Sequence, residues 1–279
     1  MPAFTTPGPI AATVEVAAAQ VRVGASERTD TVVLVEPVNK ASKSDVRVAE
    51  GTKVDFSGRL AVKTTVPGSK NGSVAISIDL PAGSSLAASV ANSSLHADGS
   101  LGECELHMAS GQVQLDSIAA LQANIAAGEV AVGHIAGRAS IEGGTATVRI
   151  GEVEGTVRLV SSAGELWIGD ARADLDLTNG SGGFDIDRAD GGVTAKTGAG
   201  AIRIGRLTRG QAELVNGSGN IEIGISEGSA AQVDANSERG TVRNSVPPQE
   251  DPGAFENKVT VHARTRHGDI AIHRARTPR

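Results

Sequence analysis

Three aspartates stand close together at positions 185, 187 and 190, in the segment Gly183-Phe-Asp-Ile-Asp-Arg-Ala-Asp190. Closely spaced carboxylates suit a hard cation such as Ca²⁺, which takes six to eight oxygen ligands. The glycine-rich nonapeptide of calcium-binding solenoids is not matched, however, and Asp185 and Asp187 flank the apolar Ile186. This alternation is typical of a solvated strand face, so we predict neither a metal ion nor a cofactor.

The other residue types that carry chemistry form no recognisable catalytic pattern. The histidines show no His-Glu-x-x-His spacing and none stands in a nucleophile motif; they are His96, His107, His134, His262, His267 and His273. The single cysteine, Cys104, excludes an intramolecular disulfide framework and a cysteine-rich metal site. It falls at an inward position of the pattern below, which predicts a buried, unreactive thiol. We therefore predict no catalytic residues and no enzyme activity.

A repeat of about 18 residues organises the chain. Similar five-residue segments start at positions separated by 17, 18, 18, 18, 18 and 19 residues, and those starts are Gly111, Gly128, Ala146, Gly164, Gly182, Gly200 and Gly219. The second and fourth residues after each start are apolar throughout, as in Ile202 and Ile204. Alternation with a period of two predicts a strand with one buried face.

A second strand follows in each repeat, with inward pairs such as Leu175 and Leu177. Glycines lie between the two strands, five residues after most starts, where we expect a corner with permissive backbone angles; they are Gly133, Gly151, Gly169, Gly205 and Gly224. Stacking such units pairs like strands in parallel. The predicted fold is an all-β, single-stranded β-solenoid with about 18 residues per coil, and the preference of parallel crossovers favours the right-handed form.

Both flanks depart from the repeat and are predicted to cap the solenoid. We expect an N-terminal β-strand cap over residues 1–80, repeats over 81–240, and a C-terminal cap over 241–279 that contains one last repeat from Gly268, all in one continuous structural domain. The strands expected in the first cap are Thr13–Val16, Gln20–Val23, Thr31–Val35, Val46–Val48, Leu60–Val62 and Val74–Leu80. A loop is expected at Pro247–Gly253, followed by strands at Lys258–His262 and Gly268–His273.

Composition and charge limit the partners. A formal net charge of −6 argues against nucleic acid, whose binding depends on neutralising phosphates with Lys and Arg. The start of the chain lacks the basic and apolar regions of a signal peptide, and no stretch is long and apolar enough for a membrane span. These features predict a cytoplasmic protein.

One outward column contains the residues best suited to contact a partner. Three positions after each start stand Gln114, Ala131, Arg149, Trp167, Asp185, Arg203 and Glu222. Parallel stacking should align them, with Arg149 against an exposed Trp167 and with Arg203 between Asp185 and Glu222. We predict a partner-binding face from Arg149 to Glu222, although a ladder of charges that only solubilises the sheet has the same pattern.

The repeats, the N-terminal strands and the phrase Ile78-Asp-Leu-Pro81-Ala-Gly83-Ser-Ser-Leu86 resemble the bacterial β-strand-repeat family known as putative adhesins. The resemblance covers nearly the whole chain and implies a domain of unknown function with a cell-surface binding role. It carries over no catalytic residues.

Three functions stay open at this stage. The first is a non-catalytic binding or scaffold module for an unknown protein or polymer, because solenoids offer extended surfaces. The second is a self-assembling structural protein similar to bacterial cytoskeletal β-helices, which would make the chain a homo-oligomer. The third is a polysaccharide-acting enzyme, which is disfavoured by the four Phe, one Trp and absent Tyr, because sugar platforms are usually aromatic.

Overall fold

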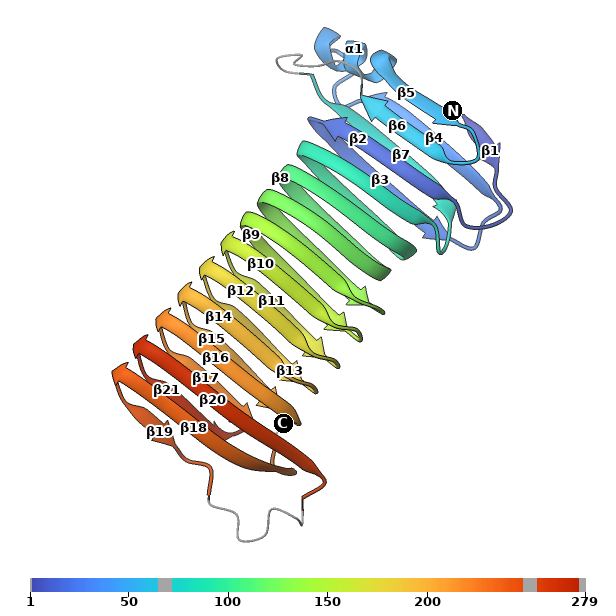
Figure 1. Cartoon of the computed structure of the whole chain (residues 1–279). Coiled ribbons are helices and arrows are strands. Elements are labelled where there is room, and N and C mark those ends of the chain that lie inside the picture. The colour runs from blue at the N-terminus through green and yellow to red at the C-terminus, as the bar shows by residue number, and fades with distance from the viewer. Residues whose placement is uncertain (1, 65–71, 248–254, 276–279) are drawn as a thin grey trace. The chain divides into compact units, whose positions relative to one another are not determined.

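The computed structural model describes residues 2–64, 72–247 and 255–275. The chain divides into two compact units, residues 1–136 and 137–279, and each is a coiled stack of β-strands (Figure 1). In the described parts of the chain, no helix is both long and apolar enough to cross a membrane.

The described residues of the first unit form eight strands and one helix. They are β1 (Ala3–Thr5), β2 (Ala11–Ala17), β3 (Ala19–Ser26), β4 (Asp30–Pro37), α1 (Lys43–Gly51), β5 (Thr52–Phe56), β6 (Leu60–Thr64), β7 (Val74–Pro81) and β8 (Ser85–Ile135). The long strand β8, of 51 residues, runs through several coils (Figure 1). Pairing in this unit is mixed. β2 and β3 pair in parallel with β8, whereas β4 on β7, β1 on β4 and β5 on β6 are antiparallel.

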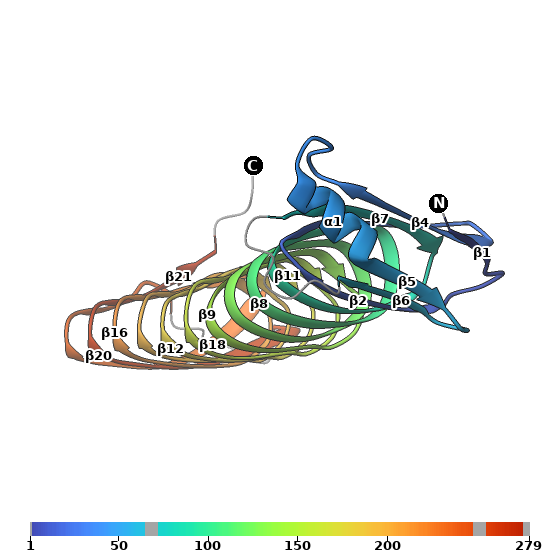
Figure 2. The same ribbon diagram turned by 90° about the horizontal axis from the view of Figure 1, so that it is seen from above.

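In the second unit, the described residues form no helix, only strands. They are β9 (Ala139–Val153), β10 (Val157–Ala163), β11 (Leu166–Ala171), β12 (Leu175–Ser181), β13 (Phe184–Ala189), β14 (Val193–Ala199), β15 (Ile202–Leu207), β16 (Gly210–Ser218), β17 (Ile221–Ile225), β18 (Ser229–Arg239), β19 (Val242–Asn244), β20 (Asn257–His267) and β21 (Ile270–Arg274). Figure 2 shows its coils from above as a series of similar loops. The predicted β-solenoid is confirmed. Partner residues on successive coils lie 18 positions apart, as in Leu166 opposite Phe184, and the hand of the coil stays a prediction.

The core consists of the apolar columns that the repeat predicted. The side chains of Val148, Leu166, Phe184, Ile202 and Ile221 meet in register from coil to coil and are at most 3% exposed. Burying a side chain of this size stabilises the fold by roughly 1.5–3 kcal/mol. Repetition of such layers, rather than one large core, therefore holds each unit together.

The predicted role of the corner glycines is wrong. Positive φ angles occur at the repeat starts, for example +131° at Gly182 and +143° at Gly200, and not at Gly133, Gly169, Gly205 or Gly224. The glycines between the two strands are required instead because the backbone of the neighbouring coil passes close to them. A Cβ at Gly224 would lie 2.0 Å from the carbonyl oxygen of Gly205 on the neighbouring coil, a distance that no side chain tolerates.

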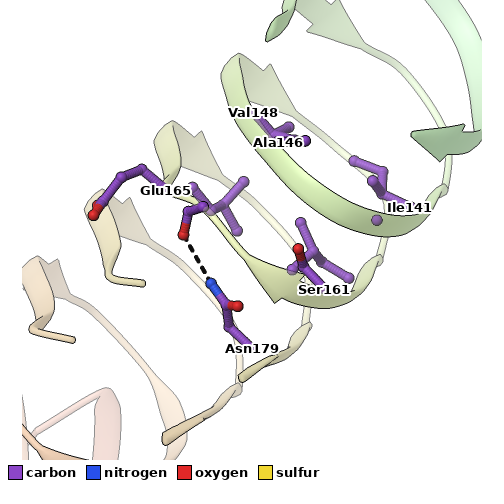
Figure 3. A pocket seen from close by; sticks show the side chains of 10 residues that line it. Ile141, Ala146, Val148, Ser161, Glu165 and Asn179 are labelled. Atoms are coloured by element: carbon purple, nitrogen blue, oxygen red, sulfur yellow. Dashed lines mark hydrogen bonds between the residues drawn. The ribbon is translucent and has the colours of Figure 1, made fainter. Parts of the chain in front are cut away.

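A polar ladder inside the second unit satisfies the backbone at the corners. Asn179 Nδ2 donates to the carbonyl oxygen of Gly164 at 2.8 Å (Figure 3), and Thr197 Oγ1 donates to that of Gly182 at 2.9 Å. Asn216 Nδ2 lies 3.0 Å from the Gly200 oxygen in the same way. Buried carbonyls that lack partners cost free energy, so these side chains are structural parts of the core.

One expected strand of the caps is wrong, and three strands, β1, β5 and β19, were not predicted. Val46–Val48 lies inside α1, because Ser42 caps this helix and its hydroxyl accepts a hydrogen bond from the Asp45 amide at 3.3 Å. An apolar alternation over three residues is too short to override a cap. Strand β5 follows the helix directly, and the predicted strands at the other positions of both caps are present. The expected loop at Pro247–Gly253 lies, beyond Pro247, outside the described residues.

The final coil in sequence is not the final coil in space. β20 pairs on one side with β16 and on the other with β18, and β21 likewise lies between β17 and β19. The first unit shows the same arrangement, since β2 lies between β6 and β8. The strands near each end of the chain, β2 in the first unit and β20 and β21 in the second, are therefore each paired on both sides. Pairing on both sides prevents the fraying that is common at chain ends.

Candidate functional site

The structure brings the five predicted face residues together in one ladder of the second unit. Arg149, Trp167, Asp185, Arg203 and Glu222 are direct cross-strand partners on β9, β11, β13, β15 and β17. Each lies between two buried residues of its strand, so its side chain points outward. The register alone therefore creates a continuous outer row.

Arg203 is the centre of the charged part of this row. Its Nη1 contacts the carboxylate of Asp185 and lies 3.0 Å from Oδ1 of Asp187. Hydrogen bonds to Asp185 and then to Asp187 raise the pKa of Arg203, against the lowering effect of burial. All three side chains are partly exposed, so water screens these ion pairs and their contribution to stability is small.

The expected bridge from Arg203 to Glu222 is wrong. Glu222 Oε1 instead lies 3.0 Å from Nε2 of His273, on β21 of the intercalated coil. Sequence reasoning missed this pair, because β21 follows β17 in space but not in sequence.

Trp167 is half-buried rather than exposed. Its indole ring lies over Gly169, where a Cβ would come within 3.1 Å of Trp167 Cη2. The absent side chain therefore makes room for the ring against the sheet. The predicted stacking of Arg149 on this ring stays a prediction, although the two residues are adjacent partners on β9 and β11.

A second row of charges runs beside the first and was not predicted. Arg188 Nη2 lies 2.9 Å from Asp170 Oδ2, and Arg172 contacts the carboxylates of Glu152 and Glu154. Glu152, Asp170 and Arg188 are in register six residues after their repeat starts. Aligning the repeats at the sixth residue after each start, as was done for the third, would have found this row in the sequence.

The three aspartates of the first motif are all paired with arginines. Arg203 holds Asp185 and Asp187, and Arg209 Nε lies 3.1 Å from Asp190 Oδ1. Guanidinium groups thus occupy the positions that a cation would take. Across the part of the chain that the structure describes, no three His, Cys, Asp or Glu side chains are grouped as metal ligands.

Cys104 is buried as predicted, with 4% of its surface exposed. Burial raises the pKa of its thiol to about 12, despite the opposing effect of a hydrogen bond from the Leu86 backbone. The thiolate is the nucleophilic form, so this residue is chemically inert at neutral pH.

The second unit contains a small internal cavity of about 10 Å³, lined by Ile141, Val148, Ser161, Asn179 and others (Figure 3). Such a volume holds about one water molecule. A shallow outer hollow of about 480 Å³ lies over β10, β12, β14 and β16, with Arg158, Asp176 and Glu213 at its surface. A second open hollow of about 380 Å³ lies over β14, β16, β18 and β20, with Asn236 and Arg264 among its lining residues.

Comparison with protein families finds a match over residues 12–273 to a family described as Toastrack DUF4097. Comparison with curated proteins gives no match. Solved structures similar to the chain include the following two. A putative adhesin from Parabacteroides merdae has 12% identity and a TM-score of 0.42, covering 97% of this chain and 94% of its own. A putative cell adhesion protein from Clostridium sporogenes has 9% identity and a TM-score of 0.25, covering 98% of both chains.

Proposed function

This chain belongs to the Toastrack DUF4097 family, and on that premise we propose that it is a non-catalytic, adhesin-like binding module that recognises another protein through the outer ladder of its second unit. The family is the one that the repeats resembled. A fold does not by itself specify a ligand.

The proposal rests on one observation, the in-register row from Arg149 to Glu222 across five strands. Neighbouring strands of a sheet lie about 4.8 Å apart, so the row extends for roughly 20 Å. A single contact face on a small protein interface has comparable dimensions. The five strands pair in series, β9 with β11, β11 with β13, β13 with β15 and β15 with β17. The three central strands are therefore hydrogen-bonded on both sides, which makes the row stiff.

The order of charges favours a protein over a charged polymer. Along the row the side chains are cationic at Arg149, aromatic at Trp167, anionic at Asp185, cationic at Arg203 and anionic at Glu222. A polyanion would meet a carboxylate at every second charged position. A protein surface with charges of both signs can match this alternation, and tryptophan and arginine are the residues most often found at the centres of such interfaces.

Site-specific photo-crosslinking tests the proposal directly. A benzophenone side chain placed at position 167 should join the protein to a partner in cells of its source, and the crosslinked protein can be identified by mass spectrometry. The matched control is Val160, which is 43% exposed. It lies on β10, a strand that carries none of the residues of the ladder. Crosslinks at 167 that are absent at 160 support the proposal.

Binding measurements with the identified partner complete the test. We expect Trp167→Ala to weaken the affinity by about 30-fold or more, the effect of losing about 2 kcal/mol at an interface centre. Val160→Ala should leave it unchanged. Equal crosslinking at both positions, or unaltered affinity of Trp167→Ala, would show that the ladder only solubilises the sheet.

A further inference from the structure

The outermost coil of the second unit has an open edge. Over the described residues, β18 pairs only with β20 and β19 pairs only with β21, whereas β20 and β21 each have strands on both sides. The backbone groups along such an edge are a template for another strand.

The interior of the coil is uncovered at the same place. Val261, Ala263 and Thr265 on β20 are at most 3% exposed, but their column partners on β18, Val233, Ala235 and Ser237, are only half-buried. On the opposite strand set, Val242 of β19 is 42% exposed, although Ile270 beside it is fully buried. A further layer placed on this end would bury the apolar columns that stop here.

The edge strands of the first unit, β1 and β5, are only three and five residues long and pair antiparallel with their neighbours. Antiparallel strands β4 and β5 lie on β7 and β6, and α1 packs against β4, β6 and β7. Figure 2 shows the helix lying across these strands. The longest of these edge strands is β18, with eleven residues, and we expect association there. A single self-complementary surface gives a closed pair, whereas an open filament needs two different ones.

The residues of β18 are complementary to a second β18 running antiparallel. With Ala235 of the two copies opposite each other, residue numbers on facing positions add to 470. Asp234, whose carboxylate and carbonyl oxygen both accept from Arg264 of β20, then faces Asn236 of the second copy, and Gln232 faces Glu238 of the second copy. An amide donor therefore lies opposite each carboxylate. Among the inward-facing residues of β18, Val233 faces Ser237 of the second copy. No like charges oppose each other over positions 232–238.

We propose that this edge is a dimer interface, in which Gln232–Glu238 of one chain pairs antiparallel with Gln232–Glu238 of a second copy. A seven-residue pairing of this kind extends about 23 Å and forms about six backbone hydrogen bonds. The proposal is independent of the ladder from Arg149 to Glu222, which lies on other strands.

The mass of the full-length chain, measured by light scattering over a wide concentration range, gives the first test. We expect a reversible transition from the 28.2 kDa chain to twice that mass, with no larger species. A constant 28.2 kDa at every concentration, or continued growth into polymers, would overturn the proposal.

Two matched pairs of variants test the register. In the dimer, position 232 of each copy faces Glu238 of the other, so a substitution there acts twice. Gln232→Glu places two carboxylates opposite each other and should weaken dimerisation by about fivefold, whereas Gln232→Lys places an opposite charge there and should strengthen it. Gln232 is exposed, so neither change disturbs the core. In the second pair, Ala235→Cys should crosslink between copies with a short bismaleimide, but Val233→Cys, whose two copies would lie about 13 Å apart along the strands, should not. Identical behaviour within either pair contradicts the assigned register, and with it the proposed interface.

Discussion

Replacing Asn179 tests whether the internal polar ladder holds the corners of the second unit. The side chain is 4% exposed, donates to the Gly164 oxygen at 2.8 Å and accepts from the Ser181 amide at 3.2 Å. Asn179→Ala removes both hydrogen bonds, to the part-buried carbonyl of Gly164 and from the N–H of Ser181. Each loss costs about 1–3 kcal/mol, so we expect the free energy of unfolding to fall by about 3 kcal/mol. For a unit of this size the corresponding decrease in Tm is about 6–12 °C.

The informative comparison is with Asn179→Thr. Thr197 occupies the equivalent position one coil along, and its hydroxyl reaches the Gly182 oxygen at 2.9 Å. Threonine at 179 should therefore restore the bond to Gly164 and cost less than about 1 kcal/mol. Thr178→Ala, an exposed change on the same strand, is the control for substitution as such and should alter stability by less than about 0.5 kcal/mol.

Urea unfolding, followed by far-ultraviolet circular dichroism and by the fluorescence of Trp167, measures these differences. Trp167 is the only tryptophan and lies in the same unit as Asn179, so its signal reports the unit that carries the substitution. The reasoning is refuted if Asn179→Ala is as stable as the wild type. It is also refuted if Asn179→Thr is as unstable as Asn179→Ala, because the column would then require asparagine for its shape and not for its hydrogen bond.

Three further outcomes are expected. The buried thiol of Cys104, whose pKa is raised to about 12, should resist maleimide in the native protein at pH 8 and react fully in urea; rapid native labelling would contradict the burial. Truncation after Glu256 removes β20 and β21 from between two other coils, so it should unfold β16–β19 cooperatively and not merely shorten the stack, as hydrogen exchange would report. Burial by itself would raise the pKa of Asp45, but hydrogen bonds from Ser73, Ser42 and Asn39 outweigh it and hold the pKa below its usual value. The ionised Asp45 therefore stabilises the fold above about pH 4, and this stabilisation is lost as the pH falls through the folded-state pKa. Urea midpoints of the wild type should therefore decline in acid more steeply than those of Asp45→Asn, and parallel pH profiles would show that Asp45 is not responsible.

The 18-residue coil, its apolar columns and the outward row from Arg149 to Glu222 were all predictable from the sequence. Each coil of a solenoid packs against a near copy of itself, so the same requirement for an inward apolar residue recurs at a fixed interval. A local pattern such as Ile202 and Ile204 is then reinforced by every other repeat. The burial of Cys104 followed from the same register.

Other features depend on contacts between segments that no repeat relates. Nothing near β20 in the sequence shows that it lies between β16 and β18, because the choice is a competition among similar strand edges that only the whole unit resolves. That choice in turn gives Glu222 its partner His273 and leaves β18 at the open edge. The indole of Trp167 was predicted to be exposed, and the space over Gly169 decided otherwise. Periodicity thus determined which way each side chain points, whereas the tertiary structure decided which neighbours it meets, since packing depends on every coil at once.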